Sequence, residues 1–259
     1  MDMTRPEAPA AFPVIELRRY AIKAGERKHF ARYFESHFPE AFEQLGALIL
    51  GQFLERGNAS SFTWIRGFKD LDARATVNQA FYSGPLWKEH AAKMNDRLID
   101  HTNVLLLHPL SAEQGIKVLP AVDAVREEEG ARGVMVAQVF AVQADRVEAF
   151  AKAAEPTFAR YRAAGVREAG VLVTLDVPNN FPRPPVRTDG PYLVWLGVVA
   201  DDQTLETGFG PLASRSLPSL TATGLLRGTP ELVVLDPTSR SRLRWLPEPR
   251  TEGTDQAAR

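Results

Sequence analysis

The sequence predicts an α+β protein in which one βαββαβ unit occurs twice and the two units close into a single pseudo-dimeric α/β barrel. Strand-like segments recur in the same order in both halves, helical periodicity separates them, and the composition is that of a globular protein. The chain has 259 residues, of which 44% are hydrophobic and 24% are charged. That balance provides enough apolar surface to offset the entropy lost on ordering the chain.

Three pairs of strand-like segments carry the repeat. They are rich in β-branched and aromatic residues, and they follow one another in the same order at similar separations. The matched pairs are 14–22 with 134–142, 62–70 with 193–201, and 105–109 with 233–237. Chance similarity among strands is the competing explanation, but the shared order favours a duplication.

The first unit contains the elements of one βαββαβ repeat. Strands are expected at 14–22, 47–56, 61–68 and 102–109. An apolar stripe with spacings of three and four residues predicts a helix over 26–45, which Pro39 should kink or split. Asp70 suits the N-cap of a second helix, and Pro85 suits the first turn of a further helix after Gly84.

The second unit repeats this order with a longer middle hairpin. Strands are expected at 133–142, 167–177, 191–201 and 231–236, with helices at 145–164 and 202–220. Most of the extra length is the Pro-rich segment 178–187, whose stiffness and polar tips suit a lid over a cavity mouth. Ordinary loop variation is the alternative explanation.

The repeat also divides the chain into domains. We expect an N-terminal extension over 1–13, a first domain over 14–110, a partly helical linker over 111–132, a second domain over 133–246 and a disordered tail over 247–259. A βαββαβ order gives an antiparallel four-stranded sheet with both helices on one face, which is the ferredoxin-like arrangement. Two tandem ferredoxin-like domains can bury their bare sheet faces against each other.

Composition limits the function. The formal net charge is −1 and there are no cysteines. A near-neutral chain is a poor partner for nucleic acid, and the lack of cysteine removes disulfides, thiolate nucleophiles and iron–sulfur clusters. We expect no membrane segment and no secretory signal, hence a cytoplasmic protein that could form a homodimer.

Several blocks of sequence resemble the bacterial NIPSNAP family. The most specific are Trp-Ile-Arg-Gly-Phe at 64–68 and Phe-Tyr-Ser-Gly-Pro at 81–85, and others lie at 15–20 and 100–107. The blocks at 178–183 and 237–240 look like those of two-domain members. The resemblance implies the dimeric α/β-barrel superfamily. That superfamily includes cofactor-free monooxygenases of aromatic polyketides, haem-degrading and haem-peroxidase enzymes, lactone isomerases and members without known activity.

Two histidines are candidate catalytic bases. His37 lies within the apolar stripe of the first helix, and His90 shares an apolar helix face with Trp87 and Met94. Either could be a general base facing a cavity, or a hydrogen-bonded core histidine. His90 could alternatively be an axial haem ligand. No pair of histidines or carboxylates has metal-ligand spacing, so neither a metal nor another cofactor is expected.

Polar residues on strands are further candidates. Glu16, Arg18 and Tyr20 share one face of the first strand, and a buried Arg66 would need a partner, for which Glu16 is the obvious choice. If these side chains pointed into the barrel, one end of it would be polar; a salt bridge at the rim is the alternative. The corresponding residues of the second unit are Val136, Gln138, Phe140, Trp195 and Gly197.

Aromatic and amide side chains could complete a site for a hydrophobic aromatic molecule. The candidate substrate-binding residues are Tyr20, Trp64, Tyr82, Trp87, Asn103 and Asn180. One hypothesis is a cofactor-independent oxygenase that holds an aromatic, polyketide-like molecule in the barrel cavity, with His37 or His90 as base and Arg66 or Asn103 contacting the resulting anion. The other is a non-catalytic binding or scaffold protein with a packed barrel.

Overall fold

The computed structural model describes residues 12–183 and 185–246. The expected N-terminal extension, apart from its last two residues, and the expected C-terminal tail lie outside the described residues. Among the helices that are described, none combines the length and apolarity that crossing a bilayer requires.

The first unit has four strands and four helices in the expected order. They are β1 (Val14–Ile22), α1 (Arg27–His37), α2 (Pro39–Leu45), β2 (Ala47–Glu55), β3 (Ser61–Phe68), α3 (Leu71–Ser83), α4 (Pro85–Asn95) and β4 (Leu98–Pro109). Pro39 divides the first helical region into α1 and α2, as its missing N–H requires. The Asp70 carboxylate caps α3 by accepting a hydrogen bond of 2.7 Å from the Ala73 amide.

The second unit repeats this order with fewer helices. Its elements are β5 (Val134–Ala141), α5 (Val147–Ala163), β6 (Arg167–Thr174), β7 (Tyr192–Val199), a π-helical segment (Thr204–Phe209), α6 (Gly210–Thr221) and β8 (Glu231–Pro237). The expected partly helical linker contains a single short 3₁₀ turn, Ala112–Gln114, among its described elements. β4 begins four residues before the strand expected from the sequence.

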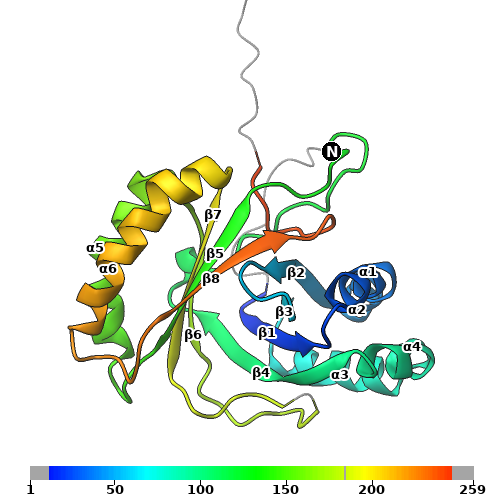
Figure 1. Cartoon of the computed structure of the whole chain (residues 1–259). Coiled ribbons are helices and arrows are strands. Elements are labelled where there is room, and N and C mark those ends of the chain that lie inside the picture. The colour runs from blue at the N-terminus through cyan, green and yellow to red at the C-terminus, as the bar shows by residue number, and fades with distance from the viewer. Residues whose placement is uncertain (1–11, 184, 247–259) are drawn as a thin grey trace, which may run out of the picture.

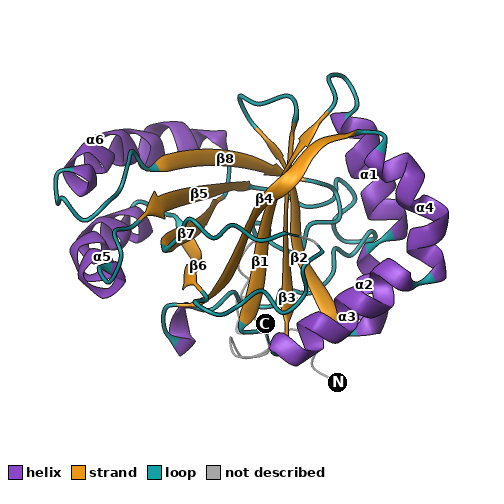
Figure 2. Ribbon diagram, turned by 90° about the horizontal axis from the view of Figure 1, so that it is seen from below, coloured by secondary structure: helices purple, strands orange, loops and turns teal. Residues whose placement is uncertain are grey.

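The eight strands close into one antiparallel barrel in the order β1-β3-β2-β8-β5-β7-β6-β4. Each unit contributes a ferredoxin-like sheet, and the two sheets meet where β2 pairs with β8 and β4 pairs with β6. Helices α1–α4 cover one flank and α5 and α6 the opposite flank, so every helix lies outside the barrel (Figures 1 and 2). The two-domain pseudo-dimeric α/β barrel is therefore confirmed.

The repeat holds at the level of strand register. β2 has an irregularity between Ile49 and Gly51, and β6 has one between Glu168 and Gly170. Opposite these positions stand Arg66 in β3 and Gly197 in β7. The register thus equates Arg66 with Gly197, as the sequence alignment of the two halves predicted.

Side chains that face the barrel axis form one apolar cluster shared by both units. It includes Leu17 and Ile65 from the first unit and Val194 and Leu196 from the second. Glu16, Arg18 and Arg66 instead face the helices, because neighbouring residues on a strand point to opposite sides of the sheet. Of the two arrangements that the sequence left open, a polar barrel interior is excluded by this apolar packing. A salt bridge at an exposed rim is excluded because the side chains of Glu16, Arg18 and Arg66 are fully buried.

Because the two units share one core, we expect them to unfold together. Ile65 and Leu196 occupy equivalent strand positions, and both are fully buried. Ile65→Ala and Leu196→Ala should each lower the free energy of unfolding by about 2–5 kcal/mol. In urea denaturation, each variant should unfold in one transition shifted as a whole. Two transitions, with only one displaced by each substitution, would contradict a common core.

Candidate functional site

A cavity of about 520 Å³ lies between the sheet of the first unit and its helices. Its walls are mainly aromatic and come from β1, β3 and the helices that cover them. The aromatic lining residues are Tyr20, Phe30, Phe34, Phe38, Phe42, Trp64, Phe81, Tyr82 and Trp87. Arg18, His101 and Arg183 also line it. Flat aromatic walls of this kind favour a flat, apolar ligand.

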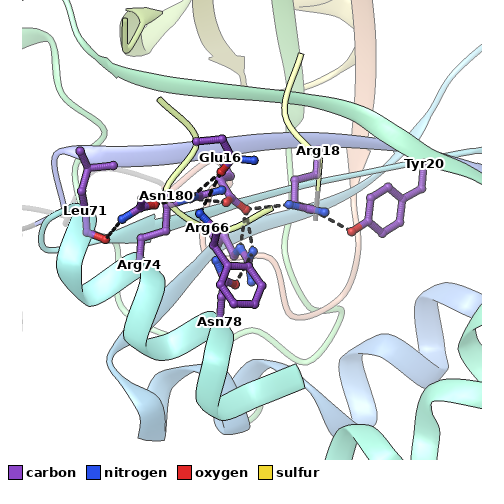
Figure 3. A network of polar contacts seen from close by, with 10 residues as sticks. Glu16, Arg18, Tyr20, Arg66, Leu71, Arg74, Asn78 and Asn180 are labelled. Atoms are coloured by element: carbon purple, nitrogen blue, oxygen red, sulfur yellow. Dashed lines mark hydrogen bonds and ion pairs between the residues drawn. The ribbon is translucent and has the colours of Figure 1, made fainter. Parts of the chain in front are cut away.

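Next to this cavity, one buried carboxylate holds three arginines (Figure 3). Glu16 Oε2 accepts hydrogen bonds from Arg18 Nη1 at 2.8 Å and from Arg66 Nε at 2.7 Å. Glu16 Oε1 accepts one from Arg74 Nε at 2.7 Å. Arg66 also donates to Asn78 Oδ1 at 2.9 Å. We call Glu16, Arg18, Arg66 and Arg74 the arginine cluster.

All four side chains of the arginine cluster are fully buried. Burial by itself would raise the pKa of Glu16, but the nearby charges of Arg66, Arg18 and Arg74 overcome that effect and lower the pKa far below its ordinary value. Glu16 is therefore ionised at neutral pH. A single negative charge then faces three positive charges in a region that water does not reach.

Two residues of the cavity wall carry buried hydrogen-bond donors that have no partner among the described residues. Arg18 Nη2 and Trp64 Nε1 are both buried and both unpaired. Tyr20 Oη accepts a hydrogen bond of 2.8 Å from Arg18 Nε, which leaves its own proton free to donate. Burial, only partly opposed by Arg18, raises the pKa of Tyr20, so the phenol stays protonated at neutral pH. The three residues lie side by side, because the Arg18 guanidinium carbon is 5.4 Å from the centroid of the Tyr20 ring and 5.3 Å from that of the Trp64 ring.

The Pro-rich segment of the second unit closes over this site in the first unit. In Figure 1 the loop after β6 runs below β4 toward α3. Arg74 Nη1 donates to Asn179 Oδ1 at 3.0 Å and to Asn180 Oδ1 at 2.7 Å, and the Phe181 ring lies parallel to that of Tyr82. The loop thus holds the arginine cluster from outside and supplies Arg183 to the cavity, as a lid would.

The equivalent region of the second unit is packed and lacks the arginine cluster. Rings of Phe158, Tyr161, Trp195 and Phe209 contact one another at centroid distances of 4.9–6.3 Å. Trp195 corresponds to Trp64, but its Nε1 donates to Glu168 at 2.9 Å. The partnerless indole N–H is therefore a property of the first unit.

The structure brings together most of the substrate-binding residues that the sequence suggested. Tyr20, Trp64, Tyr82 and Trp87 line the cavity. Arg66 lies behind the wall and pairs with Glu16, the partner that the sequence indicated. Asn180 holds Arg74 rather than lining the cavity, and its Nδ2 donates to the Leu71 carbonyl.

Asn103 lies elsewhere. It pairs across the sheet with Arg19, on the face opposite Arg18, and its Oδ1 accepts a hydrogen bond of 3.2 Å from Arg187. Its place in the fold is therefore at the base of the lid loop, outside the cavity lining.

The two candidate catalytic histidines also lie outside the cavity lining. His37 stacks on His90 with ring centroids 4.3 Å apart, and His90 Nδ1 is hydrogen-bonded to the Tyr33 hydroxyl at 2.6 Å. His37 is only half-buried; this burial, together with His90 and Lys93, lowers its pKa. This geometry gives no support to His90 as a haem ligand in the cavity. Among the described residues, no cluster of three or more acidic, histidine or cysteine side chains could bind a metal.

Sequence reasoning did not assign a role to Arg18, Arg74, His101 or Arg183. Alternation along β1 placed Arg18 beside Glu16 and Tyr20, so the signal for Arg18 was present. Arg74 and Arg183 come from α3 and from the loop of the second unit, and only the closed barrel brings them to β1. His101 lies at the cavity because β4 extends beyond the expected strand.

The whole fold matches solved structures of dimeric α/β-barrel type. A proposed monooxygenase of Lactobacillus acidophilus is 16% identical, with a TM-score of 0.54 over 89% of this chain and 97% of the other. One of Fusobacterium nucleatum is 12% identical, with a TM-score of 0.58 over 91% and 97%. An anthrone oxidase-like protein is also 12% identical, with a TM-score of 0.58 over 90% and 94%. These similarities establish the fold.

Similarity to a known protein family is found in the first unit. Residues 15–113 match the NIPSNAP family model. This unit is a NIPSNAP domain, as the resemblance of its sequence blocks implied. A search of curated proteins found no match to the chain.

Glu16 should contribute strongly to the stability of the fold. Glu16→Gln leaves three buried arginines without a countercharge, so the free energy of unfolding should fall by about 3–5 kcal/mol. The matched control is Glu231→Gln, which breaks an ion pair of Arg19 on a side chain that is 48% exposed. Urea denaturation should show a loss of less than about 1 kcal/mol for the control. Equal losses would contradict a special role for Glu16.

Stability should also fall in acid. Because the native pKa of Glu16 is lower than that of the unfolded chain, its contribution is complete above about pH 4.5, its ordinary pKa, and decreases as the pH falls below that value. Wild-type chain should lose more stability than Glu16→Gln between neutral pH and pH values below 4.5. Parallel pH profiles for the two proteins would contradict this assignment.

Proposed function

We propose that this chain is a cofactor-independent oxygenase that acts on an aromatic, polyketide-like small molecule in the cavity of the first unit. One observation carries the proposal: two residues that line the aromatic-walled cavity, Arg18 and Trp64, each have a buried hydrogen-bond donor without a partner among the described residues. Buried donors without partners are costly, and a ligand oxygen would satisfy them.

Two other cavities offer less for such chemistry. One of about 450 Å³ lies at an end of the barrel, among charged residues that include Lys117 and Glu168. Another of about 610 Å³ lies beneath the lid loop and is lined by His108, Asp145 and Arg187 among others. The cavity of the first unit is distinguished by combining aromatic walls with partnerless buried donors.

The proposed chemistry uses the reducing power of the substrate. An anthrone-like substrate enolises and loses a proton, and its oxygen becomes an oxyanion that Arg18 Nη2, Trp64 Nε1 and the Tyr20 hydroxyl would stabilise. The electron-rich ring carbon transfers an electron to O₂, and the two radicals combine to form a C–O bond. Loss of water from the hydroperoxide leaves a carbonyl. Overall, a CH₂ group and O₂ give C=O and H₂O.

The base in this proposal is His101, in place of His37 and His90, because His101 lines the cavity and lies on β4 near Tyr20. Its ring centroid is 6.2 Å from that of Tyr20. An exposed histidine can take the substrate proton and release it to solvent. The similarity of fold to an anthrone oxidase-like protein and to proposed monooxygenases supports the same reaction class.

Oxygen uptake with a dihydroxyanthrone tests the proposal. Wild-type chain should consume O₂ faster than the buffer alone and should release the corresponding quinone. Trp64→Phe keeps an aromatic ring but removes the N–H, and should lower kcat on the order of 10²-fold. His37→Ala should keep the wild-type rate, because His37 lies outside the cavity lining.

The repeat supplies a matched control. Trp195→Phe makes the same substitution at the related position, where the indole N–H is already bound to Glu168, and should leave kcat unchanged. Equal rates for Trp64→Phe and Trp195→Phe would remove the donor pair from the mechanism. Binding of the anthrone without any O₂ uptake would support the non-catalytic binding alternative.

A further inference from the structure

We infer that the cavity of the first unit prefers aromatic ligands whose oxygen at Arg18 is anionic, as in an arene carboxylate, an acidic phenolate or the enolate of an anthrone, with Arg18 as the contact residue. This inference deepens the proposed function and rests on the same cavity. It adds the charge of the ligand, which neither the fold nor the family model specifies.

The first argument is the charge of the arginine cluster. Its ion pairs join one carboxylate to three guanidinium groups, all fully buried. Among the residues that the structure describes, the other side chains that bond the cluster are neutral: Asn78, Asn179, Asn180 and Tyr20. Buried charges are normally matched by opposite charge, so the cluster has an excess of positive charge that an anion would compensate.

The second argument is the unused hydrogen-bonding capacity. Each arginine of the cluster keeps one buried nitrogen without a partner in the described part of the chain: Arg18 Nη2, Arg66 Nη1 and Arg74 Nη2. Of these three arginines, Arg18 is the one that lines the cavity. Trp64 lines the cavity too, and its Nε1 is likewise buried without a partner among the described residues. An oxyanion at this point would accept charge-assisted hydrogen bonds and would lie in the field of the two arginines behind Arg18.

The third argument is the rest of the lining. Among the described residues that line the cavity, Arg18, His101 and Arg183 are basic and none is acidic. Arg183 belongs to the lid loop, so positive charge lies at both the inner wall and the cover. A cationic ligand would meet repulsion at each of these positions, whereas an anion would not.

Binding of naphthoate and of naphthamide measures the effect of charge with little change in shape. Isothermal titration calorimetry on the full chain should show naphthoate binding at least about tenfold more tightly than the neutral amide. Titrations in buffers of different ionisation enthalpy should show no proton uptake with naphthoate, since it enters as the anion. Uptake of one proton, or tighter binding of the amide, would overturn the inference.

Two variants test whether Arg18 causes the preference for naphthoate over naphthamide. Arg18→Gln should reduce it to less than about twofold, because the charged contact is lost while Glu16 keeps two arginines. Arg19→Gln is the matched control: it lies next along β1 on the opposite face, and should keep the wild-type preference. If Arg18→Gln keeps the preference as well, the assignment to Arg18 is wrong.

Two further outcomes separate this inference from the proposed function. Naphthoate has no CH₂ group to oxidise, so its preference can hold even if O₂ uptake fails. Conversely, O₂ uptake with a neutral anthrone but no preference for naphthoate would overturn the inference alone. Inorganic phosphate that binds more tightly than naphthoate would show a general anion site, and would overturn the aromatic part of the assignment.

Discussion

The ion pairs of Glu16 are the interaction on which the site depends. A single buried carboxylate fixes guanidinium groups from β1, β3 and α3, and thereby joins the sheet to the helix layer. Through Arg74 the same cluster reaches the lid loop of the second unit. The cavity wall, the cover and the local charge therefore depend on one residue, which explains why a duplicated fold carries this site in one unit only.

The duplication produces the barrel, and the differences between the two units produce the candidate site. In the second unit Val136 replaces Glu16 and Gly197 replaces Arg66, so neither the countercharge nor the cation is present. Aromatic rings pack the corresponding space, and the related indole N–H is satisfied by Glu168. The second unit has instead lengthened one hairpin, which covers the cavity of the first. Each unit thus contributes a different part of a single site.

The fold could be predicted from the sequence because it depends on periodic signals. Strand alternation, the apolar helix stripe and Pro39 are local features, and the internal repeat reduced the possible topologies to one. The Glu16–Arg66 pair followed from charge balance along two strands. The sequence does not predict on which face of the sheet this ion pair lies, because alternation along a strand cannot distinguish the barrel side from the helix side. Arg74, Arg183 and the Asn103 contact depend on segments far apart in the chain, for which a single sequence has no signal.

The most direct test of this account is a crystal structure of the full chain with naphthoate. The account predicts that the carboxylate lies within hydrogen-bond distance of Arg18 Nη2 and Trp64 Nε1, with the rings between the aromatic walls of the first unit. It would be contradicted by a ligand bound inside the barrel, by one bound in the second unit, or by one whose carboxylate points away from Arg18 toward solvent.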